Sequence, residues 1–306
     1  MGADMRDGLT ATHRTRRARW RFPWRKSILF VFALAFGFWI LFPFYWMITS
    51  SFMTPAELGA VPPHWIPRNP TTQNYVQVTT GETSNAKSAY GSGTEGQRFP
   101  RALYYSFLVG ICVAAFNLVV GALAGYSFAR FRFFGSNVSY LLFLGSRALP
   151  TMALIIPMFI VYRNLGMIDT PWALVISYNV FTLPMTIWVL KEYFSTIPVD
   201  IEEMAMIDGA TRLQAFVKVV LPIAGPGLTA AGLIAFMESW SEFFYALCLT
   251  NQLTFPPLLA GFRRLEQVNW NALAAAAVLG VIPPVLLALL FQRFLVAGLS
   301  RGAVKG

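Results

Sequence analysis

Six apolar stretches, each long enough to cross a membrane as a helix, restrict this chain more than any other feature. In order they are Ser27–Ile48, Leu103–Phe128, Val138–Val161, Trp172–Leu190, Gly225–Leu249 and Ala272–Val296. The first has about 22 residues, and a rise of 1.5 Å per residue gives roughly 33 Å, enough for a hydrocarbon core of about 30 Å. The sequence therefore predicts an all-α, polytopic membrane protein with six transmembrane helices.

The composition and the first stretch agree with this prediction. Apolar residues make up 56% of the chain and charged residues 12%, whereas an ordinary soluble domain is about a quarter charged. A cleaved signal peptide is the alternative for the first stretch, but its apolar region is only about 7 to 15 residues long. Ser50-Ser51-Phe52 is also a poor cleavage site. We therefore expect a retained helix.

The basic residues predict which segments face the cytoplasm. The formal net charge is +10, but the basic excess lies beside apolar stretches, which indicates membrane topology and not nucleic-acid binding. Lys and Arg are about twice as frequent in the predicted cytoplasmic segments as outside. We expect a cytoplasmic basic segment 1–26, a six-span domain 27–296 with an external loop 50–101, and a cytoplasmic tail 297–306. Both termini are thus predicted to be cytoplasmic.

The segment 198–222 is a polar island between two apolar stretches. It reads PVDIEEMAMIDGATRLQAFVKVVLP. Pro198 and the acidic residues after it suit the first turn of a helix. Gly209 then interrupts the helix, and a second short helix is expected from Thr211 to Val220. Met204, Ala205 and Ile207 are spaced to leave an apolar knob on the first helix.

The spacing within this island resembles the EAA loop of ABC importer permeases. That pattern is Glu-Ala-Ala, three residues, Gly, nine residues, then Ile-x-Leu-Pro. The residues that match it are Glu203, Ala205, Gly209, Leu221 and Pro222. Met204 replaces an Ala and Val219 replaces the Ile. The wider text EEMAMIDGAT is similar to the carbohydrate branch of the family, in particular to the maltose-type second permease. Fixed spacing over about twenty residues rarely arises by chance.

The resemblance implies a type I ABC importer permease fold in a prokaryotic plasma membrane. It implies a homologous second permease, two ATPase subunits, an extracytoplasmic solute-binding protein, and a di- or oligosaccharide or related polyol as substrate. The residues expected to couple to the ATPase are Glu202, Glu203, Met204, Ala205, Ile207, Asp208, Gly209, Ala210, Leu221 and Pro222. The chain has no G-x-x-x-x-G-K-[ST] phosphate loop. We therefore expect a transport subunit and not an enzyme, with no bound cofactor of its own and with ATP and Mg on the partner ATPase.

Three ionisable residues lie within predicted spans, namely Arg147, Glu238 and Glu242. A charge at the bilayer centre costs about 2.5–3.5 kcal/mol on insertion scales, so such residues usually face a protein interior or a watery path. The spacing of four places Glu238 and Glu242 on one helix face with Ser241 and Tyr245, and Arg147 is the candidate partner of either carboxylate. Two interpretations of these residues remain open. They line or gate the translocation path, or they form a structural ion pair.

The stretch Phe236–Leu249 also resembles the family's text "WNEF…ALTL" in the fifth span. Trp240, Glu242, Phe243, Ala246 and Leu247 match it, while Ser241 stands in place of the usual Asn. Trp240 is a candidate for stacking on a sugar ring or for core packing. A different class of function, an ion-coupled secondary carrier that uses Glu238, Glu242 and Arg147, is the alternative.

Other chemistry finds little support in the sequence. The two cysteines, Cys112 and Cys248, lie inside apolar stretches, which argues against a disulfide framework, and no zinc-ligand spacing is present.

Overall fold

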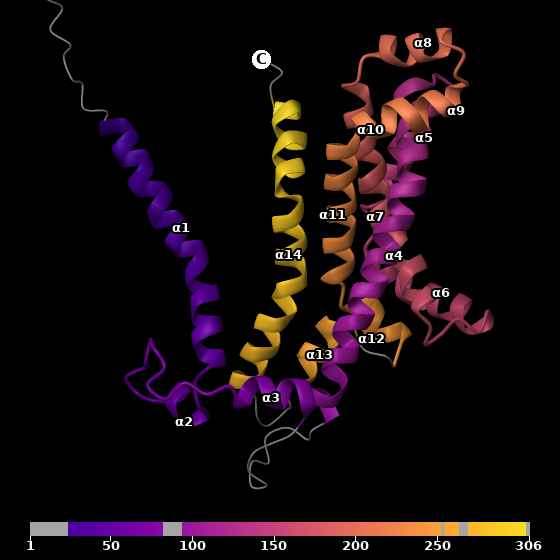
Figure 1. Ribbon diagram of the computed structural model, residues 1–306. Coiled ribbons are helices and arrows are strands. Elements are labelled where there is room, and N and C mark those ends of the chain that lie inside the picture. Colours follow the sequence, from indigo (N-terminus) through magenta and orange to yellow (C-terminus); the bar gives the residue numbers. More distant parts are fainter. Residues whose placement is uncertain (1–23, 82–93, 252–253, 263–268, 304–306) are drawn as a thin grey trace, which may run out of the picture. The chain divides into compact units, whose positions relative to one another are not determined.

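The computed structural model describes residues 24–81, 94–251, 254–262 and 269–303, and within these ranges every regular element is a helix (Figure 1). The first elements are α1 (Trp24–Ser51), α2 (Pro55–Leu58), α3 (Gln73–Thr80), α4 (Thr94–Arg130), α5 (Ser136–Ser146), α6 (Thr151–Asn164) and α7 (Pro171–Ser195). Next come α8 (Val199–Ile207), α9 (Arg212–Ala215), the π-helical η1 (Phe216–Val220) and α10 (Leu221–Ile223). The last are α11 (Gly225–Trp240), α12 (Phe244–Leu249), α13 (Phe255–Gly261) and α14 (Trp270–Ala303). The all-α prediction is confirmed.

Four helices are long and apolar enough to cross a membrane by themselves, namely α1, α4, α7 and α14. Two bent pairs qualify as well: α5 with α6, at 93°, and the segment Arg212–Ile223 with α11, at 77°. If each bent pair is one span, the described residues contain six. This is the arrangement expected of a six-span permease fold.

The third and fifth predicted spans are each interrupted in the structure. The third stretch breaks between Ser146 and Thr151, and Pro150 explains the break because a proline disfavours helical backbone at the preceding residue. The fifth stretch breaks after Trp240 and resumes at Phe244. Apolar segments lie on both sides of each break, so the length of the apolar stretch alone does not reveal the breaks, although each contains a charged residue, Arg147 or Glu242.

Other predicted boundaries also move. The helix α4 begins at Thr94, inside the predicted external loop, and α14 runs to Ala303, inside the predicted tail. Most of the basic segment 1–26 and the tip of the external loop, 82–93, lie outside the described residues.

The N-terminal part of the chain, up to Tyr45, forms a unit of its own. It consists of most of α1, and the large apolar side chains along it, such as Phe38 and Trp39, are exposed. A helix that is apolar all round requires apolar surroundings, as in a membrane. This segment is therefore described by itself.

From Trp46 onward the core is a bundle in which α4 packs on α7 and α11, and α11 packs on α7 and α14. Glycines allow α4 and α7 to approach closely. A Cβ atom on Gly121 would lie 2.6 Å from Cγ2 of Thr186, and one on Gly125 would lie 3.0 Å from the backbone nitrogen of Lys191. Small residues bring membrane helices together in this way.

A buried polar cluster joins the same two helices. Asn117 of α4 donates from Nδ2 to Oδ1 of Asn179 at 2.7 Å and to Oγ1 of Thr182 at 2.8 Å. All three side chains are buried. Because unpaired polar groups are costly in an apolar interior, this cluster fixes the register of α4 against α7.

Two asparagine side chains fasten the C-terminal end of α1 to the bundle. Asn74 of α3 donates to the carbonyls of Ser51 and Met53, at 2.8 and 2.9 Å. Asn271 of α14 donates to the carbonyls of Ser50 and Met53, at 3.2 and 2.8 Å. The final carbonyls of a helix lack partners within the helix. Here α3 and α14 supply them.

Candidate functional site

The polar island forms a hairpin at one end of the bundle, and α3 and α13 lie at the other end (Figure 1). Its first helix, α8, follows directly after Pro198 and carries Asp200 and Glu202 in its first turn. Carboxylates are favourable there because the N-terminal end of a helix has a partial positive charge. The expected helix start is thus present in the structure.

Gly209 makes the turn between the two halves of the hairpin. Its φ of 91° lies in the left-handed region, which glycine enters without steric cost. Beyond it, the hydroxyl of Thr211 and the side chain of Gln214 form a reciprocal capping box that starts α9. The expected second helix continues through η1 and α10, so the loop consists of two short helices joined by a glycine turn.

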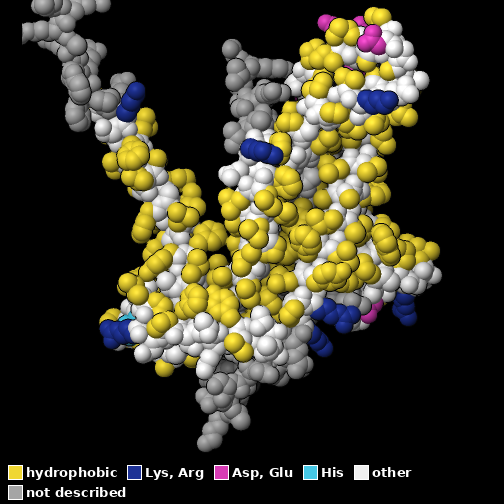
Figure 2. Space-filling model, in the orientation of Figure 1, with side chains coloured by type: hydrophobic (Ala, Val, Ile, Leu, Met, Phe, Trp, Pro, Cys, Tyr) yellow, Lys and Arg dark blue, Asp and Glu magenta, His cyan; other side chains and the backbone are white. Residues whose placement is uncertain are grey.

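The outer surface of α8 presents both apolar and acidic side chains to solvent. Ile207 is 83% exposed and Met204 57%, while Ala205 is half-buried. Glu203, Asp208 and Asp200 are exposed around them, and Figure 2 shows acidic side chains gathered over α8. The apolar knob is confirmed. An apolar knob within an acidic rim is typical of a protein-docking surface.

The opposite side of α8 is held by Glu202, which is only 5% exposed. Its Oε1 accepts from Nε of Arg130 at 2.6 Å, and its Oε2 accepts from the hydroxyl of Tyr126 at 2.7 Å. Arg130 also donates from Nη2 to the carbonyl of Ile197 at 2.8 Å. The two adjacent glutamates therefore point to different surroundings, and Glu202 faces the bundle.

Aromatic packing reinforces this contact. The ring of Tyr126 lies 4.4 Å from that of Phe216 in η1 and 5.9 Å from that of Phe194 in α7. The cluster also includes Val220 and Ile197. The C-terminal end of α4 thus contacts the C-terminal end of α7 and both helices of the hairpin.

The remaining predicted loop residues have less exposed or more peripheral positions. Ala210 and Leu221 are half-buried, Pro222 is exposed in α10, and Asp208 ends α8. Leu221 packs against the cluster around Tyr126. Ala210, Leu221 and Pro222 therefore shape the hairpin more than its outer surface, whereas Asp208 belongs to the acidic rim.

Arg147 pairs with Glu238 and not with Glu242. Nη2 of Arg147 donates to Oε1 of Glu238 at 2.9 Å. Arg147 stands at the end of α5, and Glu238 in the last turn of α11. The pair therefore joins the break in the third span to the last turn of α11.

Glu242 does not share a helix face with Glu238, because α11 ends before it. Its Oε1 accepts from the backbone N–H of Phe244 at 2.9 Å, and Oε1 and Oε2 each accept from that of Tyr245 at 3.1 Å. A carboxylate in this position satisfies the unpaired N–H groups at the start of a helix, here α12. The expected shared face with Ser241 and Tyr245 is therefore wrong.

The other predicted path residues are divided between the surface and the core. Ser241 is exposed, and its hydroxyl donates to the carbonyl of Met237 at 3.0 Å. Tyr245 is buried and donates to the carbonyl of Thr151, at the start of α6, at 2.7 Å. Trp240 is buried and packs on Phe236 and Phe255, so its ring is not available to a sugar in this structure.

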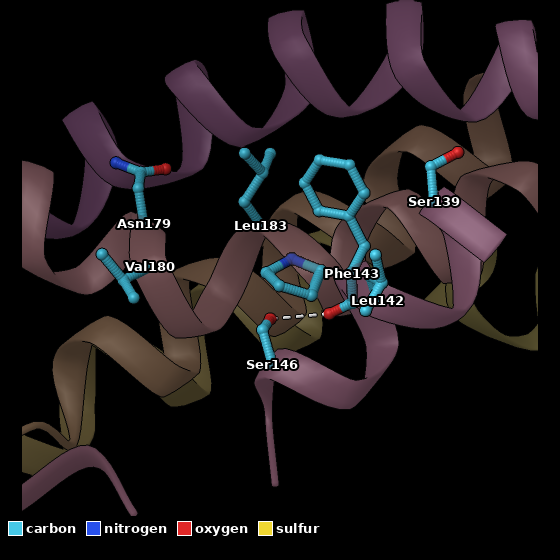
Figure 3. Close-up of a pocket in the computed structure, with 8 residues that line it drawn as sticks. Ser139, Leu142, Phe143, Ser146, Asn179, Val180 and Leu183 are labelled. Atoms are coloured by element: carbon cyan, nitrogen blue, oxygen red, sulfur yellow. Dashed lines mark hydrogen bonds between the residues drawn. The ribbon is translucent and has the colours of Figure 1, made fainter. Parts of the chain in front are cut away.

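A cavity of about 420 Å³ lies between α5 and α7 (Figure 3). Leu142, Phe143, Val180 and Leu183 give it a mainly apolar lining. The Ser146 hydroxyl, also at the cavity, donates to the carbonyl of Phe143, and Asn179 belongs to the buried polar cluster. Its polar groups are already paired, so the cavity does not resemble a sugar site. In the described part of the chain, no group of three or more metal-ligating side chains is present.

Sequence reasoning missed Tyr126 and Arg130 as parts of the site. The available signal was their spacing of four at the end of an apolar helix, which places both side chains on one face. Their partner Glu202 is far away in the sequence, and no local pattern connects them.

Comparison with known proteins assigns the family. The model of the "Binding-protein-dependent transport system inner membrane component" matches residues 117–301. The trehalose/maltose transport system permease protein MalG of Thermococcus litoralis is 33% identical, over 92% of this chain and 98% of that protein. The trehalose transport system permease protein SugB of Mycobacterium tuberculosis is 38% identical, over 69% and 79%.

A solved structure supports the fold. A chain of a bacterial ABC transporter involved in the import of the acidic polysaccharide alginate has a TM-score of 0.71 at 20% identity, with 89% of this chain and 96% of that chain covered. The comparisons give no support to an ion-coupled carrier. This is a multi-pass membrane protein and a transport component, not an enzyme. The chain belongs to the family of binding-protein-dependent transport system inner membrane components, with the type I ABC importer permease fold.

Proposed function

We propose that this chain is one of two homologous permeases in an importer for a sugar or a related polyol. Two ATPase subunits on the cytoplasmic side and an extracytoplasmic solute-binding protein complete the proposed assembly. The sugar is suggested by relatives whose names refer to trehalose and maltose. ATP and Mg bind to the ATPase subunits in this proposal, and this chain binds neither.

The observation that supports the proposal best is the two-sided character of α8. Its outer side carries the exposed Met204, Ile207 and Glu203, and its inner side is fixed by the buried Glu202. A surface helix that only covered the bundle would have no reason to expose its largest apolar side chains. The outer side fits a cleft with apolar walls and a basic rim on a partner protein.

The proposed orientation follows from the charges. The hairpin and both termini face the cytoplasm, because Lys and Arg favour that side. The end of the bundle at α3 and α13 then faces outward, where it receives the binding protein. In this arrangement, the pair of Arg147 and Glu238 lies along the span and acts as a contact that opens and closes the solute path.

The turn at Gly209 offers a direct test. In a Gly209→Val variant, a branched side chain must adopt the left-handed backbone, at a cost of roughly 1–2 kcal/mol. A Cβ atom there would meet no atom within 4 Å, so the change acts on the backbone of the hairpin and not through a clash. We expect the protein to reach the membrane while ATP-driven uptake falls by at least about ten-fold.

Gly135 provides the matched control. It has a φ of 79°, its added Cβ also meets nothing within 4 Å, and it lies outside the hairpin, before α5. Gly135→Val imposes a similar backbone cost, and uptake should stay within about two-fold of wild type. Uptake in proteoliposomes and membrane content are measured for both. Normal uptake by a well-expressed Gly209→Val protein would contradict the assignment.

A further inference from the structure

We infer that Arg130 and Tyr126, acting through Glu202, are the positioning residues that transmit movement of the hairpin to α4. This inference rests on the proposed function, because it assumes that an ATPase moves α8. It adds a defined mechanical connection between the docking surface and the transmembrane bundle. Neither α4 residue touches the outer side of the hairpin.

The connection is a closed set of hydrogen bonds on one carboxylate. Glu202 accepts from Arg130 on Oε1 and from Tyr126 on Oε2, so both oxygens are bound to the same helix. The side chains of Arg130 and Glu202 are 7% and 6% exposed. Water therefore has little access with which to replace either bond, and α8 cannot turn or slide without breaking them.

The same arginine also fixes the point where the chain leaves α7. Its Nη2 donates to the carbonyl of Ile197, one residue before Pro198 and the start of α8. Tyr126 contacts the second half of the hairpin through Phe216. One turn of α4 thus holds the beginning, the first helix and the second helix of the hairpin.

The helix that receives these contacts reaches the opposite end of the bundle. With 37 residues, α4 is about 55 Å long at 1.5 Å per residue. It packs on α7 and α11 along the bundle and on α3 and α13 at the far end (Figure 1). A displacement applied to α8 therefore reaches the external side through one continuous element.

The adjacent glutamates make a matched test of this connection. Glu202→Gln keeps the size of the side chain but removes the charge that both α4 donors share, and Tyr126→Phe removes one hydroxyl. Glu203→Gln changes only the exposed neighbour. Arg132→Gln removes an exposed cation two residues beyond Arg130 and serves as the control for charge. Each variant is purified as the full complex with its ATPase and binding protein.

The readouts are assembly of the ATPase with the permease, the rate of ATP hydrolysis, and solute imported per ATP. We expect Glu202→Gln to assemble and to hydrolyse ATP within about two-fold of wild type, with at least ten-fold less solute per ATP. Tyr126→Phe should import about three-fold less solute per ATP than wild type. Arg132→Gln should import as much solute per ATP as wild type. Glu203→Gln should instead weaken assembly, at unchanged solute per ATP in the complex that forms.

The outcomes separate the inference from the proposed function. If the assembled Glu202→Gln and Tyr126→Phe complexes both import as much solute per ATP as wild type, the inference is overturned. The proposed function then remains intact. If Glu202→Gln does not fold, Tyr126→Phe alone decides. Failure of the wild-type chain to assemble with any ATPase would overturn the proposed function itself.

Discussion

In the described residues, two ion pairs join distant elements of this protein, and they differ in almost every physical respect. Arg130 and Glu202 are 7% and 6% exposed, and the carboxylate receives a second bond from Tyr126. Arg147 and Glu238 are 36% and 27% exposed and share one hydrogen bond. Within the described chain, Oε2 of Glu238 has no hydrogen-bond partner.

This difference indicates two different roles. A buried charge pair that loses one partner leaves an uncompensated charge, which costs about 3–5 kcal/mol, whereas exposed pairs contribute about 0–1 kcal/mol. The first pair should therefore stay closed throughout a transport cycle. The second, between the end of α5 and the last turn of α11, is weak enough to open and close. Under the proposed function, the protein thus combines a fixed contact near the hairpin with a breakable contact along the solute path.

The largest expected difference is in thermal stability. Arg130→Met should destabilise the protein by about 3–5 kcal/mol, because Glu202 would remain buried without its cation. Arg147→Met should cost no more than about 1 kcal/mol, because the proposed solute path gives water access to the Glu238 carboxylate. Thermal unfolding of the two purified variants in the same detergent gives the comparison. Equal shifts in the unfolding midpoint would remove the distinction between the two pairs.

Charge reversal sharpens the comparison. Arg147→Glu combined with Glu238→Arg should return to within about 1 kcal/mol of wild type, because a half-exposed pair depends little on its surroundings. Arg130→Glu combined with Glu202→Arg should not recover, since the carbonyl of Ile197 would then face a carboxylate. The unfolding midpoints of both double variants are measured beside their single variants. Recovery at both sites would show that the buried geometry is not specific.

The smallest effect concerns a carboxylate that is satisfied mainly by backbone. The N–H of Arg68 donates to Oε1 of Glu57 and lowers the pKa of that carboxyl, and His64 lies 3.6 Å away. The lowered folded-state pKa of Glu57 means that its carboxylate stabilises the predicted external loop above the ordinary carboxyl pKa of about 4.3. This contribution is lost as the pH falls through the folded-state pKa.

Limited proteolysis of the loop tests this at two pH values. Glu57→Gln should be cleaved faster than wild type at pH 7, and the difference should shrink as the pH falls through the lowered folded-state pKa and the wild-type carboxyl becomes protonated. A difference that persists unchanged at low pH would show that the charge of Glu57 is not responsible. Glu192→Gln, at an exposed carboxyl far from this loop, is the control.

The sequence predicted the number of spans and the outline of the hairpin, for physical reasons that act locally. Apolar length sets the spans, and the left-handed backbone at Gly209 follows from the only residue that adopts it without cost. The exposure of Met204 and Ile207 followed from helical spacing.

The features that the sequence did not predict depend on the direction of helices and on contacts between residues far apart in the sequence. Hydrophobicity is the same on both sides of the break at Pro150, so it does not report a bend of 93°. The four-residue spacing of Glu238 and Glu242 indicated a shared helix face on the assumption that the helix continues to Glu242. In the structure, α11 ends at Trp240. Glu202 and Glu203 are chemically identical neighbours, and only the packing of α8 on α4 decides which one is buried.

The central claim is that the outer side of α8 meets an ATPase in the cytoplasm. The most direct measurement places a single cysteine at Ile207, in a chain whose Cys112 and Cys248 are replaced by serine, within the assembled complex. The account predicts that a short bifunctional maleimide links Ile207→Cys to the ATPase subunit, and that an impermeant maleimide does not label it from outside intact cells. Labelling from outside, or no link to the ATPase in a complex that hydrolyses ATP, would contradict the account.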